Sequence, residues 1–192
     1  MEIGYNLSRT EALNIPKDIK EKSCFVALDF DEQMKTPTDI TYEFSDGQIL
    51  SLGNLPFRCP EIFFQPSFQN SKNVTKGIHQ IVYESVMKCD GTIQSNLFAN
   101  IVLSGGHSLF PGLDNRLQKE LEKLVPPDTG CYPLIRKVLG KVSASSEREH
   151  AAWIGGSMLA SSECFKSYYQ QMSIMKEEYD ETGPTIVHQK VL

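Results

Sequence analysis

Apolar residues recur at helical spacing in two stretches of the chain, "GIHQIVYESVMKCD" and "LDNRLQKELEKLV". The apolar positions of the first stretch are Ile78, Ile81, Val82 and Val86. Those of the second are Leu113, Leu117, Leu121 and Leu124, with charged and amide side chains on the opposite side. Residues three and four apart share one face of a helix, so both stretches predict amphipathic helices. The prolines at 126 and 127 end the second one.

Three other stretches predict β-structure. The run "CFVALDF", Cys24 to Phe30, is typical of a strand that is buried on both faces. The segments "ITYEF" and "QILSLG" flank Ser45-Asp46-Gly47, and Asp-Gly tolerates the positive φ of a tight turn, which predicts a β-hairpin. The run "NIVLSGG", residues 100–106, predicts a strand that ends at a glycine pair before the second amphipathic helix.

Less regular segments separate these elements. Residues 56–68 are rich in both proline and aromatics, and we expect an ordered loop packed on the core. Residues 128–149 are irregular, which predicts an exposed insertion. In "HAAWIGGSMLAS" we expect Trp153 to be buried, with the glycine pair after it letting another backbone come close. Near the C-terminus, a helix is predicted to end at Gly183.

Composition narrows the classes of function. The chain has 192 residues, 40% of them hydrophobic, which is enough to bury a core. Its net charge of -5 and its lack of a basic stripe argue against nucleic acid as a partner. We find no apolar run near the roughly 18 residues of a membrane span, and expect no membrane partner. The five cysteines include no CxxC pair, so we expect reduced thiols, with neither a disulfide framework nor a metal site.

The glycine pair is followed by Gly106-His107-Ser108-Leu109, which matches most of the G-x-S-x-G nucleophile elbow. On that interpretation Ser108 is the nucleophile of a serine hydrolase. Its acid and base would come from Asp128 or Asp180 and from His150 or His188. The elbow needs a small residue where this chain has Phe110, and Pro111 interrupts the start of the next helix. The hydrolase therefore stays a remote alternative.

A second interpretation of the same turn is a nucleotide site. Gly105 and Gly106 lack side chains, so a purine or ribose could lie directly on the main chain. Backbone N–H groups ahead of a helix also suit polar ligand atoms. Taken alone, a glycine pair at a strand end is more often only a tight turn.

A dozen short motifs recur in the order and spacing of one protein family. They are "DIKEK", "CFVALDF", "DGQ", "FRCPE", "FQPSF", "GIH", "MKCD", "NIVLSGG", "FPG", "WIGGS", "EEYDETGP" and "IVHQK". From about Gly4 to its end, the chain closely resembles the C-terminal half of actin, and is similar to a divergent actin or actin-related protein.

The resemblance implies an α/β fold, the half-domain of an actin-type (ribonuclease H-like) ATPase, with a mixed sheet flanked by helices. Residues 1–95 would form part of the outer subdomain and the start of the large inner subdomain. Residues 96–150 would hold the strand-turn-helix of the adenosine motif and a variable insertion. Residues 151–192 would be the C-terminal return segment.

The resemblance also implies an ATP cleft of which this chain supplies the adenosine side. The implied nucleotide-binding residues are Gly105, Gly106, His107, Ser108, Leu109, Phe110, Lys17, Lys20 and Glu21. Glu149 stands where the family usually has a lysine over the adenine, so we expect ATP to bind weakly or not at all. We find no phosphate-binding hairpins, and expect no catalytic residues and no ATP hydrolysis. An N-terminal half upstream of Met1 would restore an ATP-binding actin-related protein.

A groove for partners is implied around the second glycine pair. Its residues would be Gly155, Gly156, Met158, Phe165, Tyr168 and Tyr169. We expect a cytoskeletal interaction protein of the cytoplasm, or alternatively the nucleus, that binds actin or actin-binding proteins. The other hypothesis is a remnant of little function, unstable because its facing half is absent.

Overall fold

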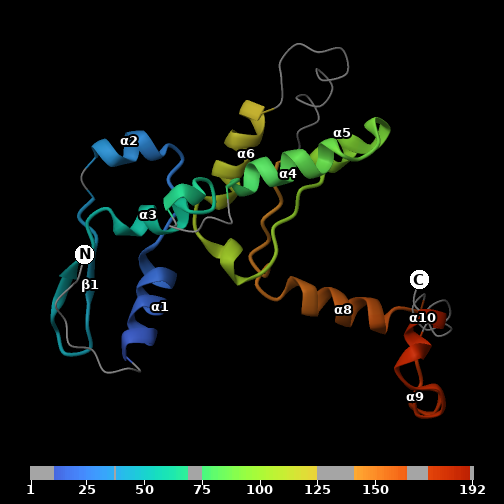
Figure 1. The fold of residues 1–192 in the computed structure, drawn as a ribbon. Coiled ribbons are helices and arrows are strands. Elements are labelled where there is room, and N and C mark those ends of the chain that lie inside the picture. The colour runs from blue at the N-terminus through green and yellow to red at the C-terminus, as the bar shows by residue number, and fades with distance from the viewer. Residues whose placement is uncertain (1–10, 37, 69–74, 125–140, 164–172, 191–192) are drawn as a thin grey trace.

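The computed structural model describes residues 11–36, 38–68, 75–124, 141–163 and 173–190 (Figure 1). The elements run α1 (Glu11–Ser23), α2 (Phe30–Lys35), β1 (Thr41–Glu43), β2 (Ile49–Ser51), α3 (Leu55–Glu61), η1 (Pro66–Phe68), α4 (Ile78–Met87), α5 (Gly91–Ala99), η2 (Gly106–Leu109), α6 (Leu113–Leu124), α8 (Ala151–Ser161), α9 (Lys176–Thr182), η4 (Gly183–Ile186) and α10 (Val187–Lys190). Figure 1 shows α4 and α6 at the centre, the hairpin at one end and α9 with α10 at the other.

The main core lies where α6 packs against α4. Leu113, Leu117 and Leu121 are buried, as the stripe predicts, and Ile78 and Val82 of α4 pack against this cluster while staying partly exposed. Each fully buried leucine side chain contributes about 2 kcal/mol by removal from water. Both predicted amphipathic helices are confirmed.

A smaller cluster joins α4 to α5, a helix that the hydrophobic pattern did not indicate. Val86 and Phe98 are buried in it, whereas Ile81 is exposed although its spacing predicted a core position. Asp90 caps α5 by accepting a hydrogen bond from the Thr92 N–H at 2.9 Å. An aspartate just ahead of an apolar segment is a helix-start signal, so the cap was the available sequence clue.

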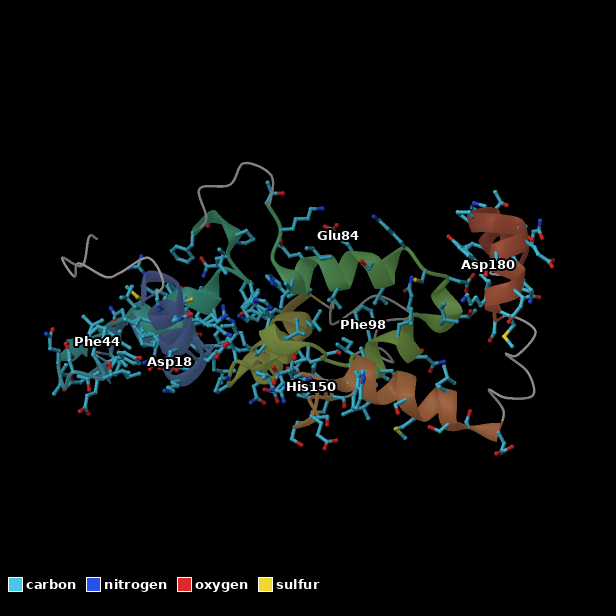
Figure 2. All side chains as sticks on the ribbon, turned by 90° about the horizontal axis from the view of Figure 1, so that it is seen from below. Asp18, Phe44, Glu84, Phe98, His150 and Asp180 are labelled. Atoms are coloured by element: carbon cyan, nitrogen blue, oxygen red, sulfur yellow. The ribbon has the colours of Figure 1, made fainter. Side chains whose placement is uncertain are left out.

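The predicted hairpin is confirmed among the described residues. β1 and β2 pair antiparallel, with Tyr42 opposite Leu50, and Gly47 has the positive φ of 81° that the turn requires. Tyr42 also ties the hairpin to α1 by donating its hydroxyl to Asp18 Oδ2 at 2.7 Å. The sheet therefore packs beside α1 at one end of the molecule, where Figure 2 shows Phe44 and Asp18 together.

The segment from Cys24 to Phe30 is buried only in part, since Leu28 is 55% exposed, and the prediction of a strand is wrong. Cys24, Val26 and Ala27 are buried in extended chain, and Phe30 begins α2. The segment's backbone partners do not belong to a neighbouring strand: Phe25 N–H donates to Pro56 O in α3 at 3.2 Å, and Val26 N–H donates to Pro111 O at 2.8 Å. Gly112 permits this approach, since a Cβ there would lie 2.6 Å from Val26 O.

The proline-rich segment contains helix α3 and the turn η1, so the prediction of a loop is also wrong. Pro56 occupies the first turn of α3, where a missing N–H costs nothing, and Pro60 lies near its end. α3 also supplies Glu61, which is fully buried and pairs with Arg116 of α6 at 3.0 Å. That ion pair links two helices that are distant in sequence.

Residues 100–106 form no strand in the structure, contrary to the pattern. Val102 makes a single parallel bridge to Ser143, and within the described ranges β1 and β2 form the one sheet. The described part of the chain is a helix-rich α/β fold with a small antiparallel sheet. The larger mixed sheet and the three domain boundaries stay predictions. Of the expected insertion, residues 128–140 lie outside the described residues; most of residues 141–149 are exposed as predicted, whereas Val142 is buried.

Helix α8, in the C-terminal part of the chain, does not pack into the core. Trp153 was expected to be buried, but it is 76% exposed on α8, and no residue of that helix is buried. The predicted helix that ends at Gly183 is confirmed as α9. None of the helices in the described ranges has the length and apolarity needed to cross a membrane.

Candidate functional site

The glycine turn after residue 104 is held in place by a segment from much later in the chain. Leu103 N–H donates to Ser143 O, and Gly105 N–H donates to Arg148 O, both at 2.8 Å. Arg148 returns a bond by donating its Nε–H to Ser108 O at 3.1 Å. These bonds run the two segments side by side, which places Glu149 at the turn.

Ser108 shapes the turn from inside. It is 7% exposed, and its hydroxyl donates to Gly105 O at 2.7 Å. Gly105 itself has φ 88°, a conformation that other residues rarely adopt. The hydroxyl of Ser108 bonds to Gly105 O, and neither His150 nor His188 bonds to it. Asp180 is also remote from α1, the helix that faces the glycine turn across the pocket: Figure 2 shows Asp180 at the opposite end of the molecule from Asp18 of α1. Asp128 lies outside the described residues, so the described geometry supports a structural role for Ser108.

A pocket of about 510 Å³ opens between this turn and α1. It is lined by Lys17, Lys20, Glu21, Gly106, His107, Leu109, Phe110, Pro111 and Glu149. Seven of the nine residues that the resemblance implied for nucleotide binding therefore meet there, together with the divergent Glu149. Gly105 and Ser108 stand behind the wall and fix its shape. The volume is within the roughly 300–1,000 Å³ that is usual for small-molecule sites.

The charges of the pocket wall are mixed. Lys17 and Glu21 form a solvent-exposed pair at 4.0 Å on α1, a kind of pair that contributes little. Across the pocket, the Glu149 carboxylate lies over the bare backbone of Gly106, since Oε1 is 3.7 Å from the place a Cβ would take. Any larger residue at 106 would bring its side chain up against this carboxylate. The glycine and the glutamate therefore share one small space.

A second, shallower hollow of about 400 Å³ adjoins the first on the other side of Lys17 and Glu21. The Asp18 carboxylate there is occupied by Lys22, 2.9 Å away, and by the hydroxyl of Tyr42. These two donors, Lys22 first, lower the pKa of Asp18, and the Asp18 carboxylate raises the pKa of both donors. The Asp18 carboxylate therefore already has two partners, and its bond to Tyr42 attaches the hairpin to α1.

Sequence reasoning missed two residues of the site, one that lines the pocket and one that holds the glycine turn in place. Pro111 lines the pocket directly, and Arg148 holds the turn through its backbone carbonyl and its guanidinium. Pro111 was considered only as an obstacle to a helix start. The sequence signal for Arg148 was its place beside Glu149, which the resemblance had already singled out.

The predicted partner groove is only partly within the described residues. Gly155, Gly156 and Met158 lie on α8, and Met158 is 69% exposed. Phe165, Tyr168 and Tyr169 fall outside the described residues, so the groove itself stays a prediction. In the part of the chain that the structure describes, no group of three or more histidine, cysteine or acidic side chains could hold a metal ion.

Comparison with known proteins agrees with the motifs. A protein-family model described as Actin matches residues 1–192. The match extends over all 192 residues, and so includes the glycine turn, the α1 wall and helix α8. The protein therefore belongs to the actin family.

Proposed function

We propose that this actin-like protein acts through contacts with other proteins at the cytoskeleton in the cytoplasm, and that it binds ATP weakly or not at all and does not hydrolyse it. The observation that carries the proposal is the position of Glu149, whose carboxylate stands in the pocket wall beside Gly106. The order of the motifs further supports one half of an actin-type, ribonuclease H-like ATPase fold.

The pocket fits the adenosine part of a nucleotide better than it fits the phosphates. Gly106 leaves backbone open for a flat ring, and Phe110 and Leu109 supply apolar surface. ATP brings several negative charges, which the Glu149 carboxylate repels, and Lys17 is partly offset by Glu21. Adenosine lacks those charges, so Glu149 should weaken the binding of ATP more than the binding of adenosine.

Calorimetry with ATP tests this part of the proposal. We expect no binding tighter than millimolar in the wild-type chain and an affinity about tenfold higher in Glu149→Lys, because one repulsive contact becomes attractive. Glu147→Lys is the matched control: it makes the same charge change two residues away, on an exposed residue outside the pocket lining. Micromolar ATP affinity in the wild-type chain, or release of phosphate from ATP by the purified chain, would overturn the proposal.

Helix α8 supports the interaction role. Trp153, Met158 and Leu159 are each at least half exposed on it. Exposed apolar surface on a helix favours binding, and we expect actin or an actin-binding protein with an amphipathic helix to cover part of α8.

A pull-down with purified actin and with candidate helices tests that role. Met158→Asp should reduce capture at least tenfold, because an apolar contact is replaced by an unpaired charge. Met34→Asp is the control, since Met34 is also exposed but lies on α2. Equal capture by the two variants would remove α8 from the proposal.

A further inference from the structure

Two cysteines from different elements meet below α1. Cys24 follows directly after α1, and Cys59 lies in α3. Phe25 N–H donates to Pro56 O at 3.2 Å, which fixes the chain next to Cys24 against the first turn of α3. Cys59 is three residues after Pro56 and so lies on the same side of the helix. Backbone bonding therefore holds the two cysteine positions together.

The thiols of this pair are in contact and unequally accessible. Each of the two thiols shifts the pKa of the other, an effect that acts only over short distances, and both cysteines are free thiols. Cys24 is 6% exposed, whereas Cys59 is exposed. A reagent from solvent therefore reaches Cys59 more readily than Cys24.

The surroundings favour a thiolate at Cys59. The hydrogen bond from Cys24, followed by the positive charge of Lys20, lowers the pKa of Cys59 to about 6. The same hydrogen bond and burial raise the pKa of Cys24. At neutral pH the exposed sulfur is the nucleophile and the buried one keeps its proton, which is the division of roles in reactive dithiols.

We propose that Cys24 and Cys59 form a redox-reactive dithiol site that takes low-molecular-weight disulfides, such as glutathione disulfide, as substrate. The Cys59 thiolate attacks one sulfur of the disulfide, whose S–S bond breaks and releases one glutathione with the electron pair. Cys24 then loses its proton and attacks the Cys59 sulfur, which expels the second glutathione. The two cysteines are oxidised to one disulfide, and glutathione disulfide is reduced to two thiols that take up the two protons.

The product would cross-link helix α3 to the segment that follows α1, the helix that forms one wall of the pocket. A bridge between Cys24 and Cys59 ties the end of α1 to α3, and Lys20 of α1 lies both beside the thiols and in the pocket wall. Oxidation would therefore fix the α1 side of the pocket. This chemistry is independent of whether the pocket binds a nucleotide.

The test treats the reduced, full-length chain with glutathione disulfide and maps the products after acid quenching. We expect a Cys24–Cys59 disulfide as the main product, formed about tenfold faster at pH 6 than a mixed disulfide on a model thiol of ordinary pKa. The rate should rise with pH to a plateau with a midpoint near 6. A glutathione adduct that persists on Cys59 in the wild-type chain, or equal labelling of all cysteines, would contradict the proposal.

Three variants separate the roles of the thiols. Cys59→Ser should abolish the internal disulfide, and Cys24→Ala should trap one glutathione on Cys59. Cys89→Ser is the matched control, because Cys89 is exposed and its thiol bonds to Ser85 O. It should leave both the rate and the product unchanged.

A readout on the wild-type chain guards against variants that fail to fold. Phenylarsine oxide binds tightly to two neighbouring thiols, so it should protect Cys24 and Cys59 together from alkylation while Cys89 stays reactive. Protection of neither cysteine would rule out a dithiol at this place.

Discussion

Helices α6 and α8 are nearly equal in length, 12 and 11 residues, yet they use apolar side chains in opposite ways. α6 is the more polar helix, and it buries Leu113, Leu117 and Leu121 in the core. α8 is the more apolar helix, and none of its residues is buried. Figure 1 shows α6 against α4, while α8 runs away from the packed helices toward α9. The amount of apolar surface therefore does not decide burial.

The arrangement around the helix axis explains the difference. The leucines of α6 form a single stripe that one neighbour, α4, can cover. α8 has small and apolar residues on all sides, and such a helix is stable only when it is covered from several directions. The contrast supports the proposed partner for α8, and substitutions that act differently in the two regions test it.

The largest effect is expected at the buried ion pair of α6. The Arg116 guanidinium donates to Glu61 at 3.0 and 3.2 Å and to Ala27 O at 2.8 Å, and it lies 4.8 Å from the centre of the Phe64 ring. Arg116→Leu leaves the Glu61 carboxylate buried without its cation, which should cost about 4 kcal/mol in the free energy of unfolding. Urea denaturation monitored by circular dichroism measures it.

Two further variants check the cause. Burial already raises the pKa of Glu61, and Arg116 opposes that rise, so the variant should lose less stability at pH 4 than at pH 7. The double variant Arg116→Leu/Glu61→Leu should recover most of the loss. Lys119 also lies in α6, and its half-exposed ion pair joins it to Asp29 at the start of α2, so Lys119→Leu should cost below about 1 kcal/mol. Similar losses for both single variants would argue that the charge at 116 is not special.

The next largest effect on stability is expected from replacing one glycine by alanine beside α6 and one in α8. Gly112, just before α6, has φ 83°, and a Cβ there would meet Val26 O. Gly112→Ala should therefore destabilise the core by about 2 kcal/mol or more. Gly155 of α8 is helical and has nothing within 4 Å of an added Cβ. Gly155→Ala should instead stabilise that helix by about 0.5–1 kcal/mol.

Urea denaturation measures the first variant, and helix content by far-ultraviolet circular dichroism measures the second. Opposite signs sharpen the contrast between a packed and an uncovered glycine. A loss of stability in Gly155→Ala would break it, because it would mean that another backbone lies against α8 in solution. Repeating the measurement across protein concentrations would show whether that backbone belongs to a second copy.

The same contrast explains what the sequence could predict. The leucine stripe of α6 and the hairpin turn at Gly47 are local patterns, and both are confirmed. The strand expected at Val26 failed because its backbone partner is the carbonyl of Pro111, a choice made by tertiary packing. The burial expected for Trp153 failed for a related reason: apolar character indicates that a side chain favours burial, and it does not say which molecule buries it.

The residues of the candidate site could be predicted from the family resemblance, but not from local sequence patterns. The α1 and glycine-turn residues meet in one pocket, as the resemblance implied, although they are far apart in sequence. No periodicity places Lys17 beside Gly106. The dithiol pair was not foreseen either, because Cys24 and Cys59 become neighbours only through the bond between Phe25 and Pro56. Local patterns define elements, and only the fold brings these groups together.

The smallest effect is expected at the half-exposed ion pair of the C-terminal region, the counterpart of the buried one. Lys190 Nζ lies 2.6 and 2.7 Å from the two oxygens of Glu178, and Met175 N–H donates to the same carboxylate at 2.9 Å. Lys190 first, and the Met175 N–H second, hold the pKa of Glu178 below its usual value. A carboxyl with a lowered folded pKa stabilises above its unfolded pKa of about 4.3 and loses this as pH falls through the folded value.

Lowering the pH below about 4.3 should therefore loosen α10 from α9 while the α4–α6 core stays folded. The Met175 amide resonance in NMR spectra reports the change, and it should titrate below the pKa of a free glutamate. Glu178→Gln should give the acid-like resonance already at neutral pH, whereas Glu177→Gln, next to it and exposed, should not. A Met175 amide that titrates near 4.3 would mean that the ion pair between Glu178 and Lys190 does not hold in solution.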